Sequence, residues 1–190
     1  MKQEFLDKPR SYKPSELLEL AGIAEPPVDL NKLVDALGIS VSRNFDFEKA
    51  GLSGKISWSD DRSTADVWVN PLDSSRRQRF TLSHELGHLF QHMLPEHSDM
   101  EAAEEFSDKP RYFHRDGSIS SIEREANRFA AQLLMPRAFV KQWAQKIAKE
   151  YRQPNGKISL SKDEFIDKLA DTFQVSKQAM EYRLKNLGII

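Results

Sequence analysis

The stretch FTLSHELGHLFQH, residues 80–92, constrains this chain more than any other feature, because it holds three of the five histidines in the sequence. A helix turns about 100° per residue, so the leucines of this stretch fall on one side and His84 and His88 fall on another. Side chains four residues apart stand one above the other on a helix. The ring nitrogens of His84 and His88 can therefore converge on one metal ion.

Glu85 lies about 100° around the helix from His84, beside the histidine pair but not in line with it. The residues form an H-E-x-x-H motif, in which the glutamate can reach a metal-bound water and take its proton. Gly87 would let another backbone approach this helix closely. The alternative is a chance match on a solvated helix face, but the amphipathic pattern of the helix favours a metal site.

A catalytic zinc ion needs a third protein ligand and one open position. His92 is the nearest candidate in sequence, but histidines at three successive four-residue steps spread over about 12 Å and cannot all reach one ion. We expect His92 to lie at the surface or behind the ligands. His97 and His114 fall in an irregular stretch and are weaker candidates.

A second amphipathic helix, expected over residues 121–134, offers two acids as the third ligand. Glu123 and Glu125 flank its apolar stripe on either side, and periodicity alone barely separates them. Small residues such as Ala126 and Ala130 would let this helix pack closely on the histidine helix. The alternative is that both glutamates only keep the helix soluble.

The composition of the 190-residue chain, 39% hydrophobic and 30% charged, fits a folded globular protein. The absence of cysteine excludes thiolate ligands, so a metal ion must bind histidine and carboxylate. A net charge of −1 argues against a protein that mainly coats nucleic acid. The sequence predicts neither a signal peptide nor a membrane helix. We therefore expect a cytoplasmic protein without membrane contact and without a small-molecule cofactor.

Periodicity and the placement of proline and glycine predict helices over residues 13–22, 29–38, 74–92, 121–134 and 137–151. Strands are predicted over residues 39–47, 51–59 and 65–70, the last two as an antiparallel hairpin. The stretch 94–120 is expected to be irregular. Two short helices joined by a turn are predicted in the tail, from residue 161 onward.

Two motifs together resemble the ImmA/IrrE family of zinc peptidases. The first is H-E-L-G-H preceded by R-Q-R-F-T, and the second is E-x-x-A-N-x-F-A-A-x-L-L-M-P at residues 123–136. The strands containing S-G-K-I and V-W-V-N are also similar to the family. The resemblance implies a zincin-like α+β fold, in which a small antiparallel sheet packs on the H-E-x-x-H helix and further helices, followed by a helical tail.

The resemblance also implies roles for individual residues. His84 and His88 match the histidine ligands of the family, and Glu85 matches its catalytic glutamate. Glu123 matches the third zinc ligand, which settles the choice between the two glutamates. Asn127 matches a position often held by Asn or Asp, where it could orient a ligand histidine through a hydrogen bond.

Members of this family cleave helix-turn-helix repressors, often encoded beside them on mobile elements or in stress-response loci. The resemblance therefore implies a zinc endopeptidase that acts on such a repressor. The alternative function is a metal-binding regulator or toxin–antitoxin component that acts without cleavage. Tyr112 and His114 lie between the two motifs and are candidates to stabilise an oxyanion. The predicted strand 65–70 could bind an extended peptide at its edge.

The chain is expected to divide into a peptidase domain, residues 1–152, and a tail, residues 153–190, packed on that domain. The tail resembles a helix-turn-helix, in which Lys177, Arg183 and Lys185 could meet phosphates. From residue 157 onward, however, six basic residues stand against five acidic ones, a difference of only +1. This balance favours packing or substrate docking over DNA contact.

Overall fold

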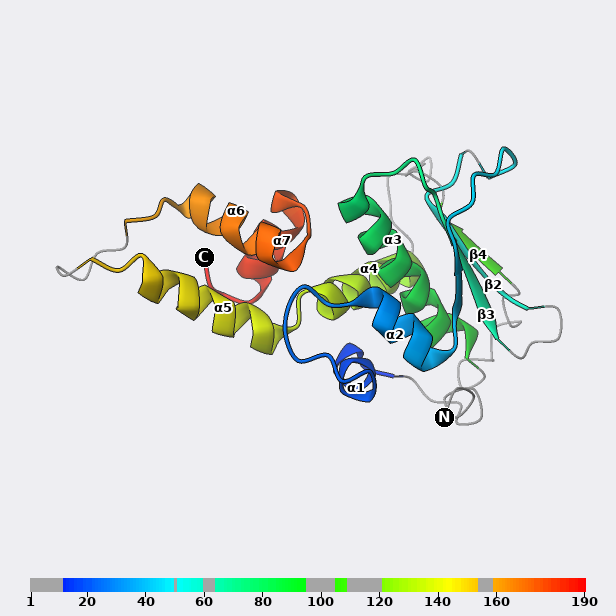
Figure 1. Cartoon of the computed structure of the whole chain (residues 1–190), viewed down its shortest axis with the longest axis horizontal. Coiled ribbons are helices and arrows are strands. Elements are labelled where there is room, and N and C mark those ends of the chain that lie inside the picture. Colours follow the sequence, from blue (N-terminus) through cyan, green and yellow to red (C-terminus); the bar gives the residue numbers. More distant parts are fainter. Residues whose placement is uncertain (1–11, 50, 60–63, 95–104, 109–120, 154–158) are drawn as a thin grey trace.

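The structure is a computed structural model that describes residues 12–49, 51–59, 64–94, 105–108, 121–153 and 159–190 (Figure 1). It confirms the expected α+β class. The elements in chain order are α1 (Pro14–Leu20), α2 (Leu30–Leu37), β1 (Ser40–Ser42), β2 (Gly54–Trp58), β3 (Ala65–Val69), α3 (Ser75–His88), the π-helical turn η1 (Leu89–Met93), β4 (Glu105–Asp108), α4 (Ser121–Leu134), α5 (Arg137–Glu150), α6 (Lys162–Phe173) and α7 (Lys177–Asn186).

The sheet has four strands in the order β1-β3-β2-β4. Strands β2 and β3 form the predicted antiparallel hairpin, with Ile56 opposite Val67. We expected an antiparallel sheet, but the sheet is mixed, because β1 pairs with β3 in parallel. Strands β1 and β2 follow each other in the chain but are not neighbours in the sheet, because β3 lies between them. Strand β4 arises from the stretch that was expected to be irregular.

Strand β3 lies inside the sheet, since β1 pairs with one of its edges and β2 with the other. A peptide therefore has no free edge of β3 to extend. The prediction that residues 65–70 bind a peptide by strand addition is wrong, because the short segment 40–42 already occupies that position. The edges in the described part of the chain belong to β1 and β4.

Side chains cap two helices close to their predicted starts. The Asp29 carboxylate accepts a hydrogen bond from the backbone N–H of Lys32 at the start of α2, and Gly38 ends that helix with a φ of 70°. The Ser74 side chain caps α3 in the same way. The histidine helix is shorter than predicted. Regular α-helix stops at His88, and a π-helical turn carries the chain to Met93.

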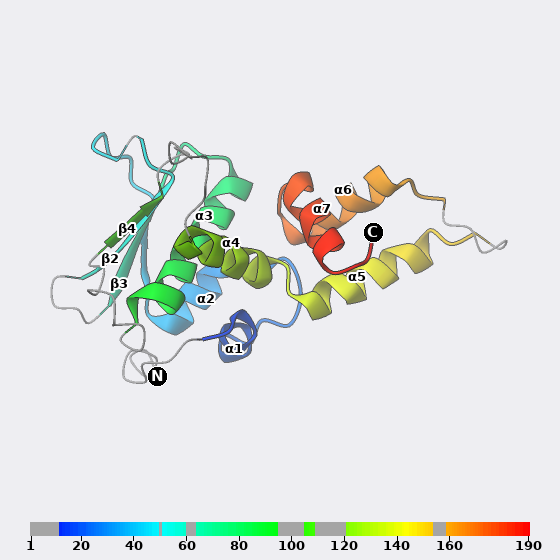
Figure 2. The same cartoon turned by 180° about the vertical axis from the view of Figure 1, so that it is seen from behind.

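Helix α3 packs between the sheet and α4 (Figures 1 and 2). All of its residues from Thr81 to His88 are buried. The leucine face contributes Leu82 and Leu86 to the core, as the pattern predicted. The opposite face, which carries the histidines, is covered by α4 and is not left to solvent. Burial on all sides fixes the position of every side chain in this segment.

Helices α5, α6 and α7 lie at the end of the molecule away from the sheet (Figures 1 and 2). The tail has the two expected helices, joined at Gln174, whose φ is 52°. The Arg183 side chain donates a hydrogen bond from Nε to the carbonyl of Met135, 2.9 Å away. The expected domain boundary at residue 153 stays a prediction. Among the described residues, no helix has the length and apolar character that a membrane span requires.

Candidate metal centre

Two small residues bring α3 and α4 into direct contact. A Cβ atom added at Gly87 would lie 2.9 Å from the Cα of Ala126 and 3.0 Å from its carbonyl oxygen. The two helices therefore touch backbone to backbone, as the sequence predicted from its glycine and alanines. Glu123 lies one turn before Ala126 on α4, so the contact brings its carboxylate to the histidines of α3.

His84, His88 and Glu123 form a compact cluster of three potential ligands. The two Nε2 atoms are 3.0 Å apart. Nε2 of His84 lies 3.3 Å from Oε2 of Glu123, and Nε2 of His88 lies 3.3 Å from Oε1. Tetrahedral ligands at about 2.0–2.1 Å from zinc are separated by about 3.3 Å. The spacing and the donor types therefore fit one zinc ion between these residues.

The two histidines of the cluster are buried, and its glutamate is partly exposed. The side chains of His84 and His88 are 3% and 2% exposed, whereas that of Glu123 is 38% exposed. Hydrogen bonds with His84 and then with His88 hold the pKa of Glu123 well below its usual range, although burial opposes this shift. Glu123 is therefore ionised at neutral pH, which is the state that binds a metal ion.

Ring contacts order the imidazoles. The Phe80 ring stacks on His84 with centroids 6.2 Å apart, and the rings of His84 and His88 meet edge to face at 4.6 Å. Sequence reasoning missed the contact of Phe80, although its position four residues before His84 was the available signal. His92 lies 5.5 Å from His88, ring to ring, and stands outside the three-residue cluster, as expected.

Glu85 is fully buried beside the cluster, on the side of α3 that faces the sheet. A Cβ atom added at Gly54, the first residue of β2, would lie 2.7 Å from its Oε1. The backbone of β2 thus approaches the Glu85 side chain closely at Gly54. The carboxylate of Glu85, the residue after His84, lies against β2 and does not belong to the ligand cluster.

The remaining candidates differ in what the structure says of them. Glu125 is exposed on α4 and lies outside the cluster. Asn127 is half-buried on α4, and in the described part of the chain no hydrogen bond joins its side chain to His84 or His88. Tyr112 and His114 lie outside the described residues. The roles of all of these residues stay predictions.

A sequence model of the M78 peptidase family, described as the IrrE N-terminal-like domain, matches residues 34–185. The chain belongs to this peptidase family. The match includes both helices of the cluster and confirms the resemblance found in the two sequence motifs. M78 is a family of metallopeptidases, and the His84, His88 and Glu123 cluster is a possible metal site in this member. A search among curated proteins gives no significant match.

The fold of this M78 member is also similar to a solved structure, that of a Mycobacterium tuberculosis transcriptional regulator. The TM-score is 0.55 at 15% sequence identity, over 90% of this chain and 53% of the other. The chain therefore spans about half the length of that regulator. At this identity the similarity concerns the fold alone, and it extends over the peptidase helices and the tail together.

Proposed function

We propose that this M78 peptidase is a zinc-dependent endopeptidase that hydrolyses a peptide bond in a protein substrate. The observation that carries the proposal is the convergence of His84, His88 and Glu123, with the buried Glu85 directly after His84 in the same helix. Two imidazoles and one carboxylate leave a fourth position of a tetrahedral zinc ion for water or substrate. A site that only stabilises the fold has no use for a buried carboxylate in this position.

Zinc bound by these residues would supply a Lewis acid that polarises the substrate carbonyl. Glu85 performs the proton transfers. Its carboxylate takes a proton from the water that attacks the carbonyl carbon, and then delivers that proton to the nitrogen of the leaving amine. His84 and His88 are held by burial and ring contacts, so the site does not reorganise during the reaction.

The test measures zinc content and cleavage separately. Purified protein is expected to bind one zinc ion per chain, and removal of the ion by a chelator abolishes cleavage, which returns on addition of zinc. Glu85→Gln is expected to keep the zinc ion and to lower kcat by about 100-fold or more. Protein that binds no stoichiometric zinc contradicts the metal site, and a Glu85→Gln variant as fast as wild type contradicts the catalytic role.

The proposed substrate is a helix-turn-helix transcriptional repressor, whose cleavage would release stress-response or mobile-element genes. The support for this substrate is membership of the peptidase family and its resemblance to repressor-cleaving members. The experiment is incubation of the zinc-loaded protein with any helix-turn-helix repressor that is encoded beside its gene, followed by mass spectrometry of the products. If the repressor binds but stays intact, the protein is instead a regulator that acts by binding.

A further inference from the structure

The start of β2 forms the wall against which Glu85 lies. Gly54 is paired with Val69 of β3 on one side and with Asp108 of β4 on the other, so its backbone is fixed within the sheet. A Cβ atom added here would lie 2.7 Å from Oε1 of Glu85 and 3.2 Å from its Cγ. It would also overlap the methyl group of Thr81. Non-bonded atoms of this kind do not approach to 2.7 Å without displacement.

We propose that Gly54 is a positioning residue for Glu85, an inference that rests on the proposed peptidase function. The missing side chain at position 54 leaves the space that the carboxylate of Glu85 occupies. A methyl group would occupy that space. Glu85 would then turn away from the position in which it exchanges protons with water and with the leaving amine.

The backbone on either side cannot yield to such a methyl group. Helix α3 is in contact with α4 on its other face, where Gly87 meets the backbone of Ala126. Strand β2 is held by hydrogen-bonded strands on both edges. The flexible parts of the contact are the side chains of Glu85 and Thr81. The substitution is therefore expected to move the general base and to leave His84 and His88 in place.

The chain offers a matched control for this substitution. Gly51 lies three residues earlier in the same connection, and a Cβ atom added there would meet no atom within 4 Å. Neither Gly51 nor Gly54 has a positive φ, so alanine fits the backbone at both positions. Gly51→Ala thus reproduces the chemical change and the effect on chain flexibility without the contact to Glu85.

The experiment compares zinc-loaded full-length Gly54→Ala with Gly51→Ala. Gly54→Ala is expected to bind zinc within about threefold of wild type, to keep KM within about threefold, and to lower kcat by about 10- to 100-fold. Gly51→Ala is expected to match wild type in all three quantities. Equal kcat values for the two variants would overturn the proposal, as would a Gly54→Ala loss that lies wholly in zinc affinity.

A Thr81→Ser background removes the methyl group that an alanine at position 54 would overlap. With this overlap removed, the Gly54→Ala variant is also more readily folded. Gly54→Ala/Thr81→Ser is expected to stay about 10-fold or more below Thr81→Ser in kcat. Recovery to the rate of Thr81→Ser would show that the Gly54→Ala effect comes from the clash with Thr81 alone. The proposed role of Gly54 in positioning Glu85 would then be wrong.

A spectroscopic measurement decides the point without any substrate. In protein labelled with 13C at the glutamate carboxyl carbons, the signal of Glu85 is identified by its absence in Glu85→Gln. Gly54→Ala is expected to shift this signal, and Gly51→Ala to leave it unchanged. An unshifted signal in Gly54→Ala would refute the positioning role. If wild type cleaves nothing, the peptidase function fails, and this comparison still tests the contact.

Discussion

Glu123 and Glu125 stand two residues apart on α4 and have different surroundings. The carboxylate oxygens of Glu123 lie 3.3 Å from Nε2 of His84 and of His88, whereas Glu125 is exposed to solvent. Helical periodicity could not separate them, because both flank the apolar stripe. Only the match to the family motif identified Glu123 as the expected ligand. The contact at Gly87 and Ala126 gives the physical reason, since it fixes the rotation of α4 on α3.

The first prediction uses this pair as target and control. Glu123→Gln is expected to weaken zinc binding by more than about 100-fold, because even partners one step behind a ligand contribute about 10- to 100-fold. Glu125→Gln removes the same charge from the same helix and is expected to leave the zinc affinity unchanged. Competition with a chromophoric chelator measures both. Equal affinities for the two variants would contradict the ligand role of Glu123.

More of the site was predictable than of its surroundings. The spacing of His84, Glu85 and His88 placed three groups on a single helix, where geometry follows directly from sequence. The contact of Gly54 with Glu85 joins a strand and a helix that are separated by 31 positions, the difference between 54 and 85. Periodicity describes one element at a time, so it could not indicate that Gly54 contacts Glu85.

At the scale of elements, the contact of α3 with α4 depends on the absence of a side chain at Gly87. Alanine is the better helix former by about 1 kcal/mol, so a solvated helix would gain from Gly87→Ala. Here the methyl group would meet the backbone of Ala126 at 2.9 Å. Overpacking of a rigid contact costs about 1–3 kcal/mol. The steric term therefore exceeds the gain in propensity.

The second prediction follows from this balance. Gly87→Ala is expected to lower the free energy of unfolding by about 1–2 kcal/mol and to weaken zinc binding, because α4 must retreat and carry Glu123 with it. Gly51→Ala, at an open position, is expected to stay within about 0.5 kcal/mol of wild type. Urea denaturation of the zinc-free proteins gives both values. A Gly87→Ala variant more stable than wild type would show that the helices are not in close contact.

Capped helices were predicted more closely than the sheet. Asp29 and Ser74 act on hydrogen-bond donors within three residues, so sequence alone placed the starts of α2 and α3. The end of α3 was missed, since the apolar pattern continues unchanged through the π-helical turn at residues 89–93. The parallel pairing of β1 with β3 was also missed. Strand direction depends on the path of the connection, which periodicity does not record.

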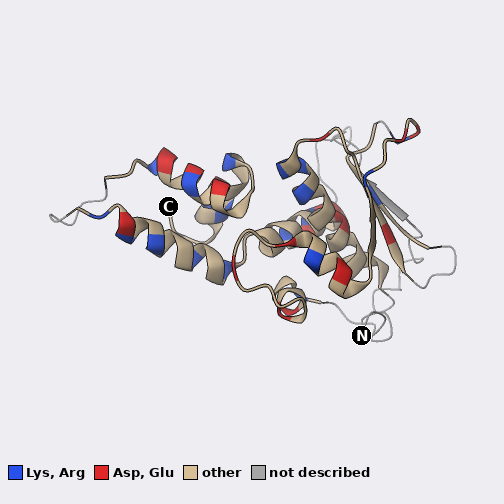
Figure 3. Ribbon diagram, viewed as in Figure 1, with Lys and Arg blue, Asp and Glu red and all other residues tan. Residues whose placement is uncertain are grey.

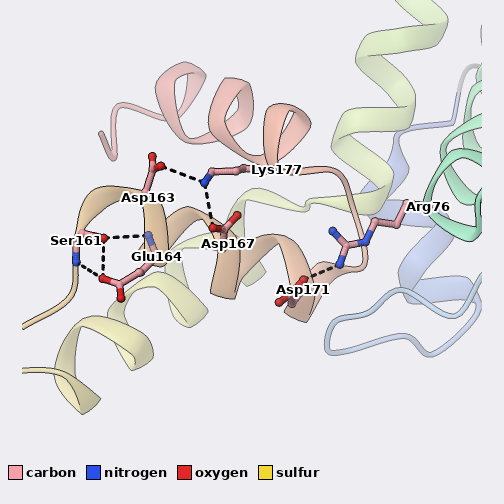
Figure 4. Close-up of polar contacts among 7 residues, drawn as sticks. All are labelled: Arg76, Ser161, Asp163, Glu164, Asp167, Asp171 and Lys177. Carbon is pink, nitrogen blue, oxygen red and sulfur yellow. Dashed lines mark hydrogen bonds and ion pairs between the residues drawn. The ribbon is translucent and has the colours of Figure 1, made fainter.

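At the scale of the whole molecule, Lys177 of the tail is already paired with acidic side chains of the protein. Lys177, at the start of α7, lies 3.2 Å from Asp163 and 3.0 Å from Asp167 on α6 (Figure 4). Asp171, one turn further along α6, pairs with Arg76 of α3. In a helix-turn-helix the start of the second helix enters the major groove. Here that position faces a row of carboxylates.

The two other basic residues considered for phosphate contact, Arg183 and Lys185, also have partners within the protein. Lys185 lies 2.8 Å from Glu181, and Arg183 binds the carbonyl of Met135. Acidic and basic positions are interspersed along α6 (Figure 3). Exposed ion pairs contribute little to stability, but each carboxylate opposes the approach of a phosphate. The charge pattern therefore favours packing or protein docking for the tail.

The third prediction tests this interpretation. The full chain is expected to bind duplex DNA no more tightly than about 10⁻⁴ M at physiological salt, the weak end of non-specific binding. A gel shift with a salt titration measures the affinity. The control is the same chain with Asp163→Asn and Asp167→Asn, which is expected to bind DNA more tightly at low salt. Tight, sequence-dependent binding by wild type would contradict the prediction.

The fourth prediction concerns how zinc stabilises the molecule. Zinc should slow amide hydrogen exchange in α3 and α4, which hold the ligands, because a ligand of the native state opposes opening of its own site. Helices α6 and α7 are expected to change less. They hold none of the three ligands, and α6 packs on α5 through buried apolar residues and not on the metal cluster. Comparison of zinc-free and zinc-loaded protein by mass spectrometry measures this. Equal slowing throughout would indicate a single cooperative unit.

The position of the three ligands in the chain has a further consequence. His88 and Glu123 are 35 positions apart, the difference between 123 and 88, and a shared ion would join them as a cross-link does. A cross-link that closes a loop of this length lowers the conformational entropy of the unfolded chain, which is worth several kcal/mol of stability, only if the bond survives unfolding. A coordinate bond does not, because it needs all three groups at once. A zinc ion bound here would therefore be a reversible link between α3 and α4, formed without cysteine.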